Sequence, residues 1–463
     1  MNGMRDDPLD LLPELFVLFG AVLGLLALTV SPKGGARWVA WLCALGLTGC
    51  LVTAVVAAFS PGGTVFGSYV LDPLTNVVRG VAALATLPCL VLARGVLARG
   101  GGLRPEAHVL MSLAALGTVT LAGAGDLLVL VAAYLLASVP GYALAGLSGD
   151  APGTEAALKY YLVGAFLGVL TLTGVTLLYG LAGTSAYPGL GGALRAVPQA
   201  AVVCALVALF AGVMFKAGGV PGHFWVPDVT EGAPAAVAAF VTTVPKLGAF
   251  AALLRMAEEF LTSSAADWRL LLALVSVATM TLGNLAAFRQ TNVRRLLAYS
   301  TISQAGYLLL PVVAVPAPLA RPALLFYLGA YAVTNLGAFA VVVATGRDTL
   351  DGYPGLSGRS PALACALAVC LLGFAGTPPT AVFLGKVMAF TAVWQGGYAW
   401  LAVVAALNTV ASLFYYLRWI VPVFRPAPSP GGDVPVRSAA LTAYAAATAS
   451  LVLGVAGGVV LPP

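Results

Sequence analysis

Three lysines lie inside long apolar stretches, where a charged group is costly. They are Lys216 in VMFKAGGVPGHFW, Lys246 in VTTVPKLGAFAALL and Lys386 in AGTPPTAVFLGKVMAF. A charged side chain within a lipid bilayer usually faces a bundle interior or a water-filled cavity, and it often marks a path for ions or protons. A buried amine can load or release a proton when its surroundings change slightly. The sequence therefore indicates proton transfer as the first candidate chemistry.

A structural alternative has to be weighed for each lysine. Near a helix end, a lysine can bury its stem and extend its charge to the membrane interface. Lys246 is almost central in the apolar stretch 233–257, which argues against this alternative. Lys216 stands beside a Gly-Gly pair and could extend along a re-entrant segment, and Lys386 is intermediate between these two cases.

The composition indicates a protein that crosses a membrane many times. The chain has 463 residues, of which 60% are hydrophobic and 9% charged, against about 25% charged in soluble domains. A membrane-spanning helix needs roughly 20 apolar residues. We expect an all-α integral membrane protein with about fourteen such helices, near 9–30, 38–60, 74–98, 107–124, 126–147, 159–182, 196–217, 233–257, 268–288, 296–315, 321–345, 361–395 (interrupted), 398–424 and 438–461.

Basic residues predict the orientation, because cytoplasmic loops are enriched in Lys and Arg. The odd-numbered loops hold Lys33, Arg37, Arg94, Arg99, Arg104, Lys159, Arg289, Arg294, Arg295, Arg347, Arg359, Arg418, Arg425 and Arg437. The even-numbered loops and the ends hold only Arg5, Arg195, Arg255, Arg269 and Arg321. We therefore expect cytoplasmic odd loops and both termini outside. The net charge of +6 then reflects topology, and we expect no nucleic-acid partner.

Two of the predicted helices are interrupted at membrane depth. One ends in Lys216-Ala-Gly-Gly-Val-Pro221, and the other contains Phe374-Ala-Gly-Thr-Pro-Pro379. Interrupted helices in corresponding places of two halves are typical of inverted-repeat transporters. The predicted organisation is a three-helix segment (1–106), a five-helix unit (107–258), a second, inverted five-helix unit (259–425) and a C-terminal helix (426–463). The interrupted helix is fourth in each unit.

The sequence gives no sign of redox chemistry in this chain. Its six cysteines are scattered singly through apolar stretches without CxxC spacing, which argues against an iron–sulfur role. No nicotinamide, flavin or phosphate-loop fingerprint is present. We expect the chain itself to bind no cofactor and no metal.

Several motifs, in order along the chain, resemble the antiporter-like, proton-conducting membrane subunits of NADH-quinone oxidoreductase (respiratory complex I), most closely the subunit N family. They cover roughly residues 120–420. The motifs are EAALKYY from Glu155, VPGHFWVPD from Val220 with EGAP from Glu231, PK at Pro245, QTNVRRLLAYS from Gln290 with QAGY from Gln304, GTPP from Gly376 with GK at Gly385, and YYLR from Tyr415.

The resemblance implies a subunit of the membrane arm of a bacterial respiratory complex, in the inner (plasma) membrane. It implies that partner subunits pass electrons from NADH to a quinone while this chain moves protons, as one subunit of a proton-translocating enzyme. The lysines at Lys216, Lys246 and Lys386 match the family's proton-handling positions. His223 matches a family histidine and is a possible relay between the first two lysines; an interface or helix-cap histidine is an equal alternative.

The chain departs from the family at one important position. The family carries a glutamate in the fifth span, which pairs with the seventh-span lysine, and anchoring on Ser138 and Pro140 places Leu135 there. An opposite charge normally keeps a buried lysine protonated, so we expect Lys216 to be mostly neutral at rest. Either the coupling is weakened or rewired, with Tyr134 or a neighbouring subunit contributing, or the chain is a divergent paralogue with impaired pumping.

Other polar residues allow two interpretations each. Asp228 and Glu231 precede the eighth span and are expected to cap it. Hydroxyls in the tenth span could support a water wire or bond across helices; they belong to Tyr299, Ser300, Thr301 and Ser303. Arg79 could be a buried cation or a lipid-headgroup anchor. As alternative functions, the chain could belong to a multi-subunit cation/proton antiporter, which has similar broken helices, or could be a non-conducting scaffold.

Overall fold

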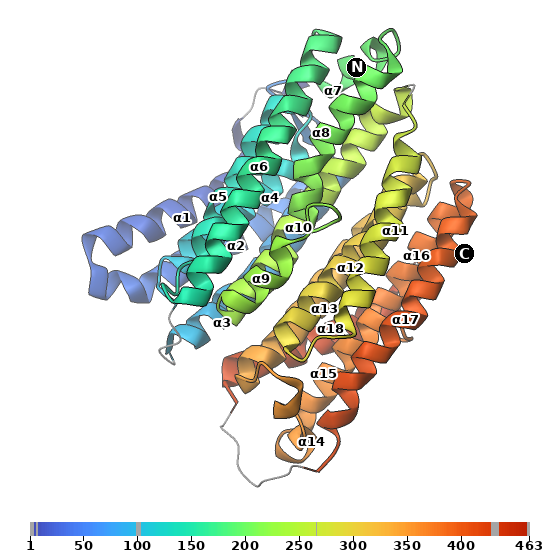
Figure 1. Ribbon diagram of the computed structural model, residues 1–463. Helices are drawn as coiled ribbons and strands as arrows, with labels where there is room; N and C mark the ends of the chain where they lie inside the picture. The colour runs from blue at the N-terminus through green and yellow to red at the C-terminus, as the bar shows by residue number, and fades with distance from the viewer. Residues whose placement is uncertain (1–3, 6–7, 99–102, 265, 427–434, 461–463) are drawn as a thin grey trace.

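The computed structural model describes residues 4–5, 8–98, 103–264, 266–426 and 435–460. Within them the chain forms a bundle of long helices that run roughly side by side (Figure 1). Twelve of the described helices are long and apolar enough to cross a membrane, and three further apolar helices are shorter. The prediction of an all-α integral membrane protein is confirmed. Arg99 of the orientation argument lies outside the described residues.

Helices of different lengths follow one another along the chain, joined by short connections. They are α1 Leu12–Val30, α2 Pro32–Ala57, α3 Pro73–Ala98, α4 Ala107–Gly123, α5 Leu127–Ala145, α6 Ala151–Ala182, α7 Tyr187–Ala193, α8 Gln199–Ala217, α9 Trp225–Gly232, α10 Ala235–Glu259, α11 Trp268–Ala287, α12 Val293–Ala314, α13 Ala320–Thr345, α14 Leu356–Arg359, α15 Pro361–Ala375, α16 Ala381–Gln395, α17 Ala399–Val423 and α18 Arg437–Val460. A small sheet of β1 Met4–Arg5, β2 Gly63–Val65 and β3 Tyr69–Leu71 was not expected.

The core of the bundle is formed by α10, α12 and α13. Their apolar windows are almost completely covered by other helices, whereas those of α1, α2 and α18 are mostly exposed. α12 packs against α10, α11, α13 and α16, so it touches both halves of the chain. A helix that is apolar on all sides suits such a buried position. This places Lys246, on α10, at the centre of the molecule.

Both predicted interruptions are real ends of helices. α8 stops at Ala217 and α15 stops at Ala375, and the next residues, Gly218 and Gly376, have φ values of +72° and +79°. Glycine is favoured at such left-handed C-terminal positions because it has no Cβ. After each glycine, a backbone N–H bonds back to a carbonyl of the last helical turn, from Gly219 to Met214 and from Thr377 to Leu372.

One helix boundary differs clearly from the sequence prediction. α6 begins at Ala151, whereas the apolar pattern predicted a start near residue 159. The side chain of Asp150 accepts a hydrogen bond from the Gly153 N–H at 3.0 Å and caps the helix. Hydropathy alone misses this polar first turn, although an Asp at the N-cap with a Pro in the first turn, here Pro152, is a helix-start signal.

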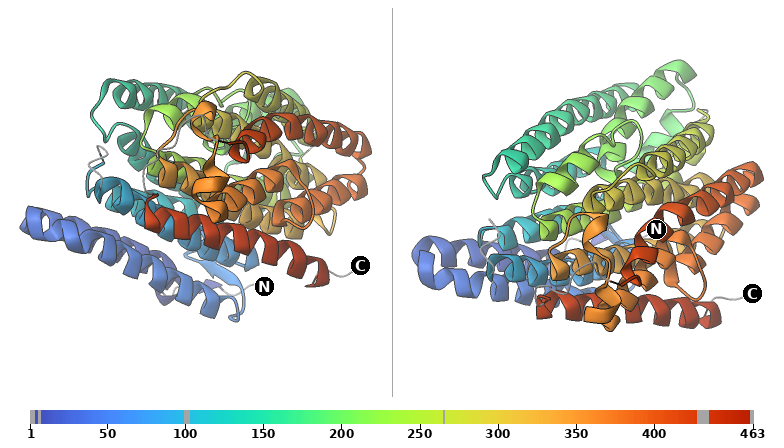
Figure 2. Two further views of the ribbon diagram at one scale, coloured as in Figure 1. Left: turned by 90° about the horizontal axis from the view of Figure 1, so that it is seen from below. Right: turned by 60° about the horizontal axis from the view of Figure 1, so that its bottom comes forward.

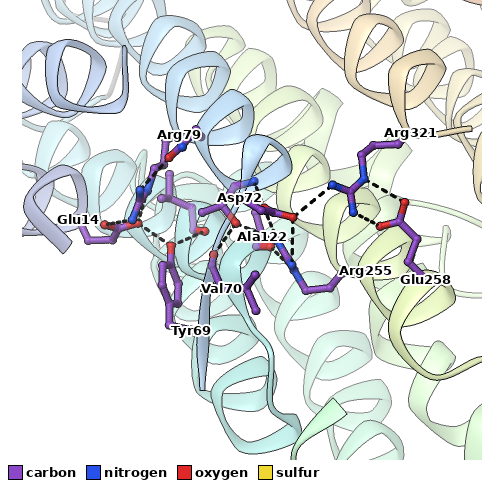
Figure 3. Close-up of polar contacts among 12 residues, drawn as sticks. Glu14, Tyr69, Val70, Asp72, Arg79, Ala122, Arg255, Glu258 and Arg321 are labelled. Atoms are coloured by element: carbon purple, nitrogen blue, oxygen red, sulfur yellow. Dashed lines mark hydrogen bonds and ion pairs between the residues drawn. The ribbon is translucent and has the colours of Figure 1, made fainter. Parts of the chain in front are cut away.

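Charged side chains tie the N-terminal helices to the bundle (Figure 3). Arg79 is fully buried and forms an ion pair with Glu14 at 2.7 Å, so of the two interpretations it is the buried cation. Asp72 pairs with Arg255 at 2.9 Å and with Arg321 at 3.4 Å. Burial alone would raise the pKa of Asp72, but the charge and hydrogen bonds of Arg255 outweigh it and hold the pKa below its usual value. This carboxylate therefore stays charged and links α3, α10 and α13.

Candidate functional site

Lys216 lies in the last turn of α8, immediately before the helix ends. Its side chain is 1% exposed, and its Nζ has no hydrogen-bond partner among the described residues. The Nζ lies over the ring of Tyr134 on α5, 5.6 Å from the ring centroid. A cation over an aromatic face is attracted by the ring quadrupole. The site therefore offers Lys216 a weak partner in place of a carboxylate.

Aromatic rings hold the end of α8 in place. Tyr160 stacks on Trp225 with centroids 4.2 Å apart, and both rings contact Phe215. The indole N–H of Trp225 donates to the Phe215 carbonyl at 2.9 Å. That carbonyl belongs to the last turn of α8, where helical partners are lacking. Lys216 is thus fixed by neighbours that are large and mostly apolar.

Leu135 faces away from the lysine. It is 46% exposed, whereas Tyr134, its neighbour on α5, is 4% exposed and lies beside Lys216. Consecutive helical residues point about 100° apart, since a turn takes 3.6 residues. The contribution of Tyr134 to this site stays a prediction, which the position of its ring beside Lys216 supports.

Lys246 reaches the end of α8 from the neighbouring helix. It is fully buried on α10, and its Nζ donates to the Thr301 carbonyl of α12 at 3.1 Å. A Cβ added to Gly218 would lie 3.0 Å from this Nζ. The glycine therefore serves two needs, a left-handed backbone and close approach of the ammonium group. Lys246 therefore lies between the C-terminal end of α8 and the central helix α12.

Polar side chains of α13 surround the point where Lys246 meets α12. The Tyr331 hydroxyl donates to the Thr242 carbonyl at 2.6 Å and lies 3.1 Å from the Thr301 hydroxyl. Asn335 donates to the hydroxyls of Thr242 and Thr243 at 3.0 and 2.8 Å. These groups are all buried. They form a satisfied polar cluster inside an otherwise apolar core, which is costly unless its members are paired.

Lys386 lies at the second break. Its Nζ donates to the Phe374 carbonyl at 2.9 Å and lies 4.2 Å from the ring centroid of Tyr307. Thr409 is a further, weaker partner at 3.4 Å. Phe374 is in the last turn of α15, whose carbonyls lack helical partners. A Cβ on Gly376 would meet the Lys386 side chain at 2.9 Å, so the break glycine again packs against a lysine.

Gln304 connects the central helix to the second break. Its amide donates to the same Phe374 carbonyl at 3.1 Å and accepts from the Tyr327 hydroxyl at 2.7 Å. Gln304 is one turn beyond Thr301 on α12, about 4.5 Å along the axis. Two residues of α12 one turn apart therefore border the two lysines: the Thr301 carbonyl accepts from Lys246, and Gln304 shares the Phe374 carbonyl with Lys386.

His223 lies in the turn between α8 and α9. It is 5% exposed, its Nδ1 has no recorded hydrogen bond, and its ring contacts Phe224. No hydrogen bond links it to Lys216 or Lys246 among the described residues. The relay role of His223 stays a prediction.

The expected capping role of Asp228 and Glu231 is wrong. α10 begins after Pro234 and has no side-chain cap. Instead Asp228 pairs with Lys159 at 3.0 Å and with Arg295 at 3.1 Å, and Glu231 pairs with Arg295 at 2.8 Å. The two acids lie in or next to α9, and they connect it to α6 and α12 across the two halves of the chain.

Two of the four tenth-span hydroxyls bond across helices. Ser300 pairs with Tyr416 of α17 at 2.5 Å, and Thr301 pairs with Tyr331. The Ser303 hydroxyl has no recorded partner. Sequence reasoning did not single out Tyr327, Tyr331 or Asn335. The available signal was their polarity within the apolar stretch 321–345.

Comparisons with known proteins agree with this geometry. The family model described as the transmembrane region of NADH:quinone oxidoreductase and Mrp antiporter subunits matches residues 124–412. This range contains all three lysines and both helix breaks. The chain belongs to this family of membrane subunits.

Several similar proteins show which subunit of this family the chain resembles. The chain is 51% identical to "NADH-quinone oxidoreductase subunit N 1" of Streptomyces griseus, over 99% of this chain and 98% of that protein. It is 46% identical to subunit N of Mycobacterium sp. (strain JLS), over 97% of both. A chain of respiratory complex I from Thermus thermophilus with bound aureothin is 33% identical, with a TM-score of 0.81, over 97% of this chain and 98% of that one.

The fold is also shared with an antiporter complex. A chain of the Mrp complex from Dietzia sp. has a TM-score of 0.83 and covers 98% of this chain and 96% of its own length, at 24% identity. At that identity the likeness concerns the fold alone. The relatives that are 51% and 46% identical to this chain are both named subunit N.

Proposed function

We propose that this chain is a proton-translocating membrane subunit of an NADH-quinone oxidoreductase. Its close relatives of nearly full length carry the name subunit N. One observation carries the proposal: two helix breaks, each with a lysine packed on its glycine, both border polar groups of α12. Electron transfer belongs to partner subunits of the complex, which uses NADH and a quinone, and this chain moves the protons.

The proton path runs through the buried amines. Lys246 and Lys386 hold and release protons, because burial makes the charged and neutral forms of an amine close in free energy. The side chains of Thr301, Tyr331 and Gln304 supply donors and acceptors between them. Lys216 feeds this path from the first break.

The absence of a carboxylate beside Lys216 defines its role. A neutral resting amine at this position accepts a proton when a negative charge approaches through the complex, and it releases the proton towards Lys246 when that charge is neutralised. Tyr134 stabilises the charged form transiently through its ring. The geometry supports this rewired coupling over impaired pumping, because the outward position of Leu135 leaves Tyr134 as the contact of Lys216.

We further propose fourteen membrane crossings, with α4 as one and α15 plus α16 as the two parts of another. The units 107–258 and 259–425 are then inverted repeats with both chain termini outside. The distribution of basic residues supports this topology. The chain lies in the bacterial inner membrane, among other membrane-arm subunits.

The proposal is tested in the intact complex reconstituted in vesicles. Lys246→Ala and Lys386→Ala should abolish most proton uptake per NADH oxidised, with the complex still assembled. Lys159→Ala, at an exposed ion pair, is the matched control and should pump normally. Full pumping by both buried variants would show that the chain is a scaffold. Sodium-driven proton exchange without NADH would favour the antiporter alternative, which the shared fold supports.

A further inference from the structure

A large apolar groove lies between α2, α3, α13 and α18. Its cavity volume is about 920 Å³, near the upper end of the roughly 300–1,000 Å³ of ligand pockets. Its walls include Val81, Leu84, Phe326, Val333 and Leu453, and none of the three lysines lines it. Figure 2 shows the C-terminal helix α18, in red, running alongside the N-terminal helices, in blue. The groove is therefore separate from the proton path.

Small residues make the groove hollow. Ala44, Ala85, Ala445 and Ala449 line it together with Gly329 of α13. A Cβ added to Gly329 would meet nothing within 4 Å. Close-packed interiors leave few voids of this size, so the four helices present a surface that something else must fill.

A single cation marks one end of the groove. Arg94, near the end of α3, is exposed, and its guanidinium lies 5.6 Å from the ring centroid of Trp41. Ser438 and Thr442 at the start of α18 also line the groove, and no lining residue is acidic. Arg94 forms no ion pair with any carboxylate among the described residues. The groove thus has an apolar length and an uncompensated positive end.

We propose that this groove binds a phospholipid with an anionic headgroup, of the phosphatidylglycerol type. Arginine binds phosphate oxygens in a planar, bidentate manner, and tryptophan is enriched at the level of lipid headgroups. The headgroup lies at Arg94, Trp41 and Ser438, and the acyl chains run between α3, α13 and α18 towards Phe326 and Leu453. A quinone or an apolar helix would fill the groove but would leave the Arg94 charge without a partner.

The site belongs to the leaflet on the side of the basic loops. Arg94 lies beside the loop that follows α3, and Arg437 opens α18 at the same end. By the distribution of basic residues this end is cytoplasmic. The lipid would join the N-terminal helices to α18, which otherwise packs mainly on α13, α15 and α16.

The test uses the whole complex in vesicles of phosphatidylethanolamine and phosphatidylglycerol. These contain a trace of phosphatidylglycerol with a photoactivatable acyl chain, and labelled peptides are mapped by mass spectrometry. The expected labels fall within 325–336 and 441–453. Gly329→Leu fills the groove without a clash and should remove them. Gly180→Leu, at an exposed helical glycine that also has nothing within 4 Å, should leave them unchanged.

Headgroup selectivity is tested with a matched phosphatidylcholine probe carrying the same acyl chains. The native chain should prefer the phosphatidylglycerol probe by about tenfold, the ratio that corresponds to 1.4 kcal/mol, and Arg94→Gln should remove the preference. Leu84→Trp, on the exposed rim, is a second groove-filling variant should Gly329→Leu fail to assemble. Equal labelling by both probes, labelling that survives groove filling, or cross-links only to a quinone probe or another subunit would overturn the proposal.

Discussion

The two helix breaks hold their lysines in different ways. Lys216 has no hydrogen-bond partner among the described residues and lies 5.6 Å from the ring centroid of Tyr134. Lys386 donates to the Phe374 carbonyl at 2.9 Å and lies 4.2 Å from the ring centroid of Tyr307. A carbonyl acceptor favours the charged amine more than a distant ring does. On the proposed function, the second break suits retention of a proton and the first suits its release.

Arginine substitutions should give the largest effects and separate the two sites. Arginine keeps the positive charge but does not deprotonate in proteins. Lys386→Arg should lower pumping by about 10²-fold, the size of a lost acid–base step, and it can still donate to Phe374. Lys216→Arg should in addition lower the yield of assembled complex, because no acceptor awaits its guanidinium. Pumping per NADH and the yield of complex are measured together; normal pumping by Lys386→Arg would rule out proton release there.

Gln304→Leu should interrupt the link between the two breaks. The substitution removes the amide that shares the Phe374 carbonyl with Lys386 and accepts from Tyr327. Pumping should fall by about tenfold, which corresponds to 1.4 kcal/mol on the barrier, while NADH oxidation continues.

Tyr327→Phe is the control for that variant, since it removes only the hydroxyl bonded to the Gln304 oxygen. It should lower pumping much less. An equal loss in both variants would mean that the Tyr327–Gln304 hydrogen bond, and not the Gln304 amide at the Phe374 carbonyl, accounts for the effect.

Alanine in place of the glycine at either helix break should have a smaller effect on pumping than the substitutions of Lys386 and Gln304. A left-handed residue other than glycine costs about 1–2 kcal/mol, and Cβ contacts with Lys246 or Lys386 add to this at Gly218 and Gly376. Gly183 has a similar φ of +69° and nothing within 4 Å, so Gly183→Ala isolates the backbone cost. Thermal unfolding and pumping are compared for all three variants. Equal effects would show that the lysine contacts contribute nothing.

Changes at Tyr134 should have the smallest effect. Tyr134→Phe keeps the ring and removes a hydroxyl without a recorded partner, so pumping should be nearly unchanged. Tyr134→Leu removes the ring and should cost about 1 kcal/mol, or roughly fivefold in rate. A larger effect of the phenylalanine variant would show that the hydroxyl, and not the ring, serves Lys216.

The sequence was sufficient to predict the long apolar helices, the two helix ends at glycine and the burial of the three lysines. Gly218 and Gly376 are glycines followed closely by prolines, and such local signals end helices in any context. The burial of Lys246 followed from its central place in an apolar stretch. The free-energy cost of a charged side chain in a membrane depends on its position along one helix, so a single sequence is enough to identify a buried lysine.

Contacts between distant segments could not be predicted in the same way. Apolar spans show little periodicity, so nothing indicated that Leu135 faces outward and Tyr134 inward. The pairs Glu14–Arg79 and Asp228–Arg295 join residues far apart in the chain. The capping role expected for Asp228 and Glu231 failed because both acids form ion pairs with cations of α6 and α12.

The central claim is that this chain translocates protons although it lacks the family's glutamate beside Lys216. Its most direct test is the number of protons taken up per NADH oxidised by vesicles that contain the complex, with the native chain and with Leu135→Glu. We predict the same ratio in both, because position 135 faces away from Lys216, and a lower ratio when Lys216→Ala is introduced into either. A ratio that rises in the Leu135→Glu complex would contradict the account and identify the native chain as impaired in pumping.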